Sequence, residues 1–236
     1  MFFLFSGEGP TDLGVEQAKA RVCNAHQFRI GPLAVMVDQL VQRQCKYSVL
    51  HGTHFGYVPK SVVKELESGL RKPPKSMRLS GKKRARETLY FFSGARVLAV
   101  IAKEVVEETG KEVVVIFFRD ADKSSAGRGG FLDKRKSMEA GFELESFAKG
   151  VPMIPVPTSE AWLICALSKS NPAKSPPSKY AGVKKSKALK MELEELLGEH
   201  PSGERLRELV SNQTIDVEKI DMECFIQFRR RLEEVV

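Results

Sequence analysis

The chain has 236 residues, of which 42% are hydrophobic and 29% charged, a composition typical of a globular protein with one substantial core. Its formal net charge of +8 favours polyanionic partners, nucleic acid first. No apolar run approaches the ~20 residues needed to span a bilayer, and the first residues lack the basic start of a signal peptide. The four cysteines form no Cys-x-x-Cys pair and fit reduced thiols. We therefore expect a cytoplasmic protein that makes no membrane contact.

Three apolar segments predict strands, and helical patterns separate them. Residues 2–5 and 113–118 are too uniformly apolar to be half exposed, which is typical of strands inside a parallel sheet. Residues 151–156 predict a third strand, at a sheet edge because the segment contains prolines. Apolar residues at helical spacing predict helices over 33–45, 59–70, 87–109, 132–147, 160–167, 184–197 and 216–236. This alternation predicts an α/β fold whose central, mostly parallel sheet is flanked by helices.

The predicted elements suggest one α/β domain with additions. We expect this domain over residues 1–170, with a helical, basic insertion at about 15–95. Residues 171–236 predict a helical C-terminal extension that packs on the same core.

Acidic residues follow the predicted strands. Glu8 comes after the first strand, Asp120 and Asp122 after the second, and Glu160 lies in the first turn of the helix after the third. Ligands of open α/β sheets bind at the carboxyl ends of the strands, and hard carboxylate oxygens are the ligands that Mg²⁺ prefers. Alternatively, Asp120 caps a turn, Asp122 is merely solvated, and Glu160 only complements its helix dipole.

Glu8 stands between Gly7 and Gly9, which allow unusual backbone angles and a close approach by other groups. The loop lacks the third glycine of the dinucleotide fingerprint and the Gly-Lys-Ser/Thr of a phosphate-binding loop. We therefore expect this turn to present an acid, with the glycines making room for it.

These motifs resemble the TOPRIM domain of topoisomerases, primases and overcoming-lysogenization-defect (OLD) nucleases. The resemblance lies in "SGEGPTD" and "IFFRDAD", although more than 100 residues separate them, which is longer than the compact TOPRIM spacing. "GVPMIPVPTSEAWLICAL" at 150–167 is similar to small stand-alone TOPRIM-like bacterial proteins, often encoded beside an ABC-type ATPase in a phage-defence setting. The resemblance implies Glu8, Asp120 and Asp122 as catalytic, metal-binding residues for Mg²⁺ or Mn²⁺. It also implies Glu160 as a ligand at a second metal position.

Two basic runs, at 71–86 and 179–190, predict contact with a nucleic-acid backbone without base reading. Alternatively, they are solvated surfaces. Arg119 and Lys123 flank the aspartates and either contact the scissile phosphate or balance the acids. The candidate nucleic-acid-binding residues are Lys72, Lys75, Arg78, Lys82, Lys83, Arg84, Arg119, Lys123, Lys184 and Lys185.

The leading hypothesis is a Mg²⁺-dependent nuclease that acts on DNA or RNA, as the effector of a bacterial anti-phage or toxin-like system. One alternative is a non-catalytic nucleic-acid-binding or regulatory subunit of an ATPase complex. Another is a haloacid-dehalogenase-like phosphohydrolase, in which Asp120 would be a nucleophile and Glu8 would have no role.

Overall fold

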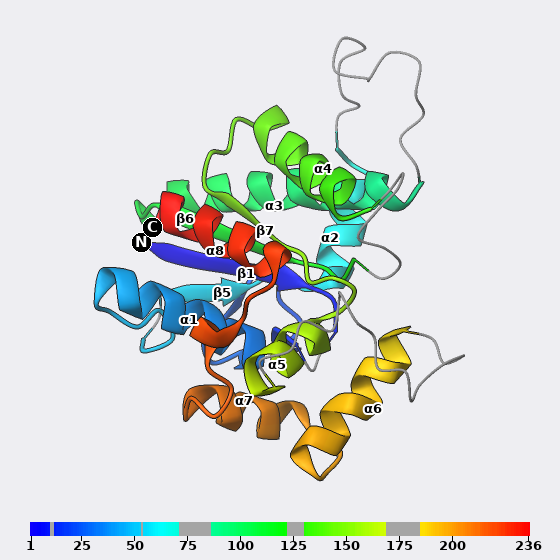
Figure 1. The fold of residues 1–236 in the computed structure, drawn as a ribbon. Helices are drawn as coiled ribbons and strands as arrows, with labels where there is room; N and C mark the ends of the chain where they lie inside the picture. The colour runs from blue at the N-terminus through cyan, green and yellow to red at the C-terminus, as the bar shows by residue number, and fades with distance from the viewer. Residues whose placement is uncertain (10–11, 53, 71–85, 122–129, 169–184) are drawn as a thin grey trace.

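The centre of the fold is a five-stranded sheet with the strand order β3-β5-β1-β6-β7, flanked by helices (Figure 1). Four of its strands are parallel, and β3 is antiparallel to its neighbour β5. The predicted α/β class is therefore confirmed. The computed structural model describes residues 1–9, 12–52, 54–70, 86–121, 130–168 and 185–236.

The two central strands are β1 (Phe2–Gly7) and β6 (Val113–Phe118). Every residue of β6 is buried, as its unbroken apolar sequence predicts for a strand covered on both faces. The register pairs Gly7 with Phe118, so both strands end at the same level. The predicted third strand is β7 (Gly150–Met153), and it lies at the edge of the sheet, where its proline is tolerated.

The region expected to be a helical insertion also contributes strands. β5 (Phe55–Tyr57) pairs with β1, and β3 (Cys23–Asn24) pairs with β5 at the other edge of the central sheet. β2 (Gly14–Glu16) and β4 (Phe28–Ile30) form a separate antiparallel pair. Strands of two or three residues are too short to show a period of two in the sequence.

The helices cover both faces of the sheet. Figure 1 shows α3 and α4 packed together on one side, and α1 and α8 on the other. α7 was not predicted, and the helix expected over 216–236 begins only at Glu223, after a short 3-10 turn. Their bounds are α1 Pro32–Cys45, α2 Lys60–Glu67, α3 Arg86–Thr109, α4 Phe131–Leu144, α5 Ser159–Ser168, α6 Lys185–Leu197, α7 Gly203–Ser211, η3 Val217–Lys219 and α8 Glu223–Val235. Within the described ranges, no helix is long and apolar enough to cross a membrane.

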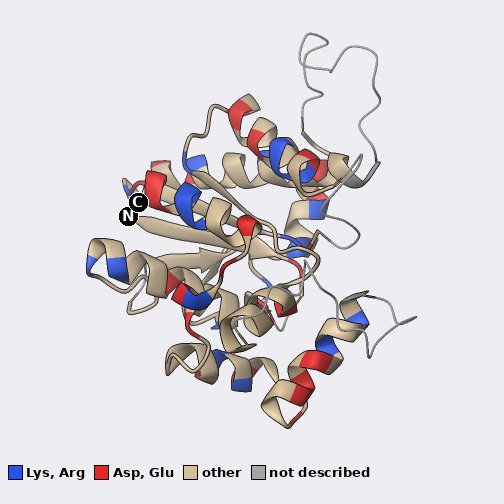
Figure 2. Cartoon of the chain, in the orientation of Figure 1, with Lys and Arg blue, Asp and Glu red and all other residues tan. Residues whose placement is uncertain are grey.

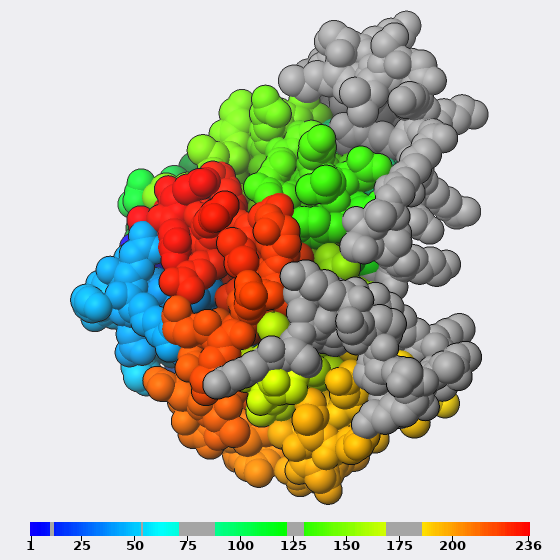
Figure 3. All heavy atoms as spheres, viewed as in Figure 1, coloured from blue at the N-terminus to red at the C-terminus, as the bar shows by residue number. Residues whose placement is uncertain are grey.

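The C-terminal helices share the core of the sheet domain. Trp162 of α5 is fully buried, with its ring centroid 5.0 Å from that of Phe225 and 5.8 Å from that of Phe228, both on α8. In the space-filling view, α8 and the segment before it lie across the molecule between α1 and α4 (Figure 3). The aromatic cluster therefore joins the C-terminal end of the chain to the helix that follows β7.

Candidate functional site

The structure brings Glu8 and Asp120 together at the carboxyl end of the sheet. Glu8 follows β1, Asp120 follows β6, and the backbone N–H of Asp120 donates to Glu8 Oε1 at 3.2 Å. This contact follows from the parallel register, because neighbouring parallel strands deliver their C-terminal residues to one edge. The two motifs, 112 residues apart in sequence, thus form one site.

Two cations hold the second oxygen of Glu8. Arg119 Nη2 donates to Glu8 Oε2 at 2.8 Å, and Lys60 Nζ, at the start of α2, lies 3.5 Å from the same oxygen. Glu8 is only 22% exposed, so these contacts fix its orientation rather than merely neutralising it in solvent.

Asp12 is a further acid of the site that sequence reasoning did not identify. Its Oδ1 accepts a hydrogen bond at 2.5 Å from the hydroxyl of Ser159. Burial raises the pKa of Asp12 to about 7, and the charges of Glu160 and Glu8 contribute to this shift. The motif "EGPTD" places Asp12 in the same loop as Glu8, so the loop presents two acids, not one.

The glycines of this loop make room for groups other than Glu8, which corrects the expectation from the sequence. A Cβ on Gly9, whose φ is +82°, would lie 2.1 Å from Asp12 Oδ2. A Cβ on Gly7 would lie 2.8 Å from side-chain atoms of both Leu13 and Phe118. Gly9 therefore allows the approach of Asp12, and Gly7 allows the close packing of the two strand ends.

Asp120 lies at the N-terminus of α5. Its Oδ1 accepts a hydrogen bond at 3.0 Å from the backbone N–H of Ser159, a donor that has no partner inside the helix. Burial raises the pKa of Asp120 to about 8, and Asp12, Glu160 and Glu8 raise it further by repulsion. The hydroxyl of Ser159 donates to Asp12, so this one residue binds both aspartates.

Glu160 is the fourth acid of this region. It occupies the first turn of α5, and its carboxylate is 3.7 Å from Lys190 Nζ of α6. Its charge acts on both Asp12 and Asp120, which locates it near the cluster. We use the name acid cluster for Glu8, Asp12, Asp120 and Glu160.

The donor chemistry of the acid cluster fits a divalent cation. Its ligands are hard carboxylate oxygens. Burial, and after it the repulsion between the acids, raises the pKa of Asp12 and Asp120, and a bound cation would offset this cost of ionisation. Within the described ranges, no group of three or more His, Cys, Asp or Glu residues has the arrangement of a metal site. Asp122, the remaining predicted ligand, lies outside these ranges.

Most of the predicted nucleic-acid-binding residues lie outside the described part of the chain. These are Lys72, Lys75, Arg78, Lys82, Lys83, Arg84, Lys123 and Lys184. Lys185 begins α6, and Arg119 is only 15% exposed because it faces Glu8. On α4 acidic and basic residues are mixed, and on α6 the lysines lie in the first half of the helix and the glutamates in the second half, so neither helix is basic along its whole length (Figure 2).

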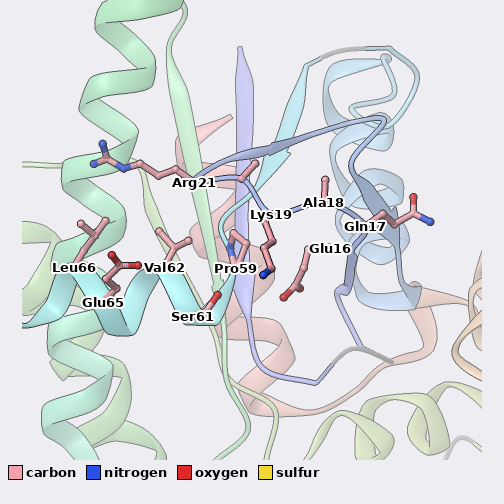
Figure 4. Close-up of a pocket in the computed structure, with 11 residues that line it drawn as sticks. Glu16, Gln17, Ala18, Lys19, Arg21, Pro59, Ser61, Val62, Glu65 and Leu66 are labelled. Atoms are coloured by element: carbon pink, nitrogen blue, oxygen red, sulfur yellow. The ribbon is translucent and has the colours of Figure 1, made fainter.

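A surface pocket of about 750 Å³ opens between α2 and the segment at 16–21 (Figure 4). Pro59 and Ser61 line it, but neither Lys60, which lies between them and contacts Glu8, nor any residue of the acid cluster is among its lining residues. Its charged lining residues are two acids and two bases, Glu16, Glu65, Lys19 and Arg21. Because these charges balance, the lining favours neither an anionic nor a cationic ligand.

The fold and the acid cluster define an α/β protein with crowded carboxyl groups where its parallel strands end. A scan against protein-family models, a search of curated proteins and a search of solved structures each found no match. The TOPRIM resemblance therefore stays a prediction from the two motifs.

Proposed function

We propose that this chain is a Mg²⁺- or Mn²⁺-dependent nuclease that hydrolyses phosphodiester bonds of nucleic acid. The observation that carries the proposal is the convergence of Glu8, Asp12 and Asp120. The backbone of Asp120 binds Glu8, and Ser159 binds both aspartates. Crowded carboxylates with raised pKa values are typical of functional sites, since a stable fold does not need them.

In this proposal Asp12, Asp120 and Asp122 hold the metal, and Glu8 either completes the ligand set or transfers the proton. A divalent cation in such a site supplies positive charge that stabilises the attacking and leaving oxygens of an in-line displacement at phosphorus. Other residues of the chain orient the carboxylate oxygens of the site. Ser159 fixes both aspartates, and Arg119 with Lys60 fixes Glu8.

The contact between Glu8 and Asp120 favours the nuclease over the phosphohydrolase alternative. Burial raises the pKa of Asp120 to about 8, and a cation bound nearby would lower it and stabilise the carboxylate in either role. Glu8, which the phosphohydrolase leaves without a role, contacts Asp120 directly.

The proposed partners follow from charge and from the resemblance. The basic runs at 71–86 and 179–190 would bind DNA or RNA through its phosphates. An ABC-type ATPase is the proposed protein partner, and defence against phage in a bacterial cytoplasm is the proposed setting.

Cleavage of plasmid, single-stranded DNA and tRNA, with Mg²⁺, with Mn²⁺ and with EDTA, tests the proposal. We expect metal-dependent cleavage that Asp120→Asn and Glu8→Gln lower by at least 100-fold while nucleic-acid binding persists. Glu204→Gln, which removes an exposed acid of α7, is the matched control and should cleave like the wild type.

Normal cleavage by Asp120→Asn would exclude the assignment of the site. Metal-independent binding without cleavage, alone and with the ATPase, would identify a binding subunit. Hydrolysis of small phosphomonoesters without nuclease activity would favour the phosphohydrolase.

A further inference from the structure

Both oxygens of Glu8 are bound from the end of β6. Oε1 accepts from the backbone of Asp120, and Oε2 accepts from Arg119 at 2.8 Å. The two donors belong to consecutive residues, so the single turn after β6 binds both oxygens of the carboxylate. Arg119 and the backbone of Asp120 therefore set the orientation of Glu8 together.

Arg119 is itself held in place by aromatic rings. Its guanidinium carbon lies 3.8 Å from the ring centroid of Tyr90 and 5.4 Å from that of Phe91, both on α3. Its backbone N–H donates to the carbonyl of Met153 on β7 at 3.0 Å. A planar guanidinium stacked at this distance has little rotational freedom, and an ammonium group could not make the same contact.

The surface that Arg119 offers to a ligand is small. The side chain is 15% exposed, one hydrogen-bonding arm is used by Glu8, and Nε is buried without an acceptor among the described residues. Arginines frequently bind phosphates through two parallel N–H groups, and in Arg119 one of these groups is already used by Glu8.

We infer that Arg119 is a positioning residue that orients Glu8, that Tyr90 is its stacking support, and that Arg119 does not bind a nucleic-acid phosphate. The inference rests on the proposed function, because it assigns Glu8 a task at the metal site. It replaces the expectation that Arg119 contacts the scissile phosphate.

Two measurements on Arg119→Gln distinguish the roles. A phosphate contact contributes to counterion release, so its loss lowers the slope of log K against log[salt] by about one and raises KM. The loss of a group that orients a metal-binding carboxylate instead lowers metal affinity or kcat, typically by 10- to 100-fold. We expect Mn²⁺ affinity, measured by electron paramagnetic resonance without substrate, and kcat to fall within this range. KM and the salt slope for binding a labelled oligonucleotide in EDTA should not change.

Three further variants refine the test. Arg119→Lys keeps the charge but not the planar stack, and should recover only part of the Mn²⁺ affinity. Tyr90→Leu should weaken Mn²⁺ binding more than Tyr90→Phe, which keeps the ring. Arg207→Gln, which removes a partly exposed arginine of α7, is the control for the loss of one positive charge.

The two proposals fail in different ways. A reduced salt slope with unchanged Mn²⁺ affinity in Arg119→Gln would overturn the positioning role. Absence of cleavage by the wild-type protein would overturn the nuclease proposal, and Mn²⁺ affinity would still decide the role of Arg119. If Arg119→Gln does not fold, the comparison of Tyr90→Leu with Tyr90→Phe decides, and equal Mn²⁺ affinities would overturn the inference.

Discussion

At the residue scale, Asp12 and Asp120 couple the stability of the fold to pH. Burial raises their pKa values from 3.8 to about 7 and about 8, so the folded chain retains protons that the unfolded chain releases. The free energy of unfolding therefore falls as the pH rises from about 4 to about 8. We expect the metal-free protein to melt at a lower temperature at pH 8 than at pH 5 in scanning calorimetry.

The Asp120→Asn variant provides the control for this effect. Since asparagine does not ionise, the variant should unfold at a higher temperature than the wild type at pH 8 and lose the part of the pH dependence that Asp120 contributes, while the part from Asp12 remains. Roughly 1–3 kcal/mol of stabilisation is expected at pH 8. Mn²⁺ should likewise raise the melting temperature of the wild type at pH 8, because a cation favours the ionised acids. A melting temperature independent of pH would contradict the electrostatic account.

Gly9 gives a second prediction, about the approach of Asp12 to the site. Gly9→Ala and Gly198→Ala both place a side chain at positive φ, +82° and +72°, and each should destabilise the fold by about 1 kcal/mol. Only the Gly9 variant also displaces Asp12, because a Cβ on Gly198 would meet nothing within 4 Å. Mn²⁺ binding should therefore weaken in Gly9→Ala alone. Equal Mn²⁺ affinities in the two variants would remove Asp12 from the metal site.

The sequence predicts part of this site and misses the rest for a physical reason. Glu8 and Asp120 directly follow long apolar strands, so the rule for strand ends locates them. Asp12 is four residues further on, in a loop whose path no periodicity describes, and only tertiary contact with Ser159 reveals it. The inward orientation of Arg119 depends on Tyr90, which is 29 positions away in a different element.

At the scale of the element, the packing of α3 against α4 depends on a glycine. A Cβ on Gly141 of α4 would lie 2.4 Å from the carbonyl oxygen of Phe92 and 2.8 Å from Cβ of Ala95, both on α3. The backbone of α3 cannot shift away without disturbing the helix, so Gly141→Ala should destabilise the protein by about 1–3 kcal/mol in urea titrations. Gly69→Ala, whose nearest contact would be an ordinary 3.6 Å, is the control and should be nearly neutral.

The elements that the sequence predicts are those with long, uniform patterns. β6 and α1 coincide with their predicted segments to within one residue, and Gly110, at φ +66°, directly follows the last residue of α3. The short strands β2 to β5 form because neighbouring chain segments pair with them, and their two or three residues carry no period of their own. α7 was not predicted because it has only nine residues and few of them are apolar.

For the whole molecule, the aromatic cluster around Trp162 tests whether the chain unfolds as one unit. Phe228 is 2% exposed and stacks on Trp162, so Phe228→Ala should cost about 3–5 kcal/mol of stability. Trp162 is the only tryptophan, so its fluorescence reports the cluster directly. Leu196→Ala, at a position 46% exposed, is the control and should have little effect.

Comparison of that fluorescence with far-ultraviolet circular dichroism completes the test. If α8 and the sheet share one core, the two unfolding transitions coincide in wild type and variant. Separate transitions would show that the C-terminal helices unfold independently.

The register between β1 and β6 makes the geometry of the site independent of how many residues lie between its two motifs. Gly7 pairs with Phe118, so Glu8 and Arg119 occupy the next level of the ladder whatever path the chain takes between them. Related chains could therefore gain or lose residues in the stretch between the two motifs without moving the carboxylates, provided that β5 and the helices over the sheet are kept. Searches for such relatives should use the two strand ends as anchors and leave the spacing free.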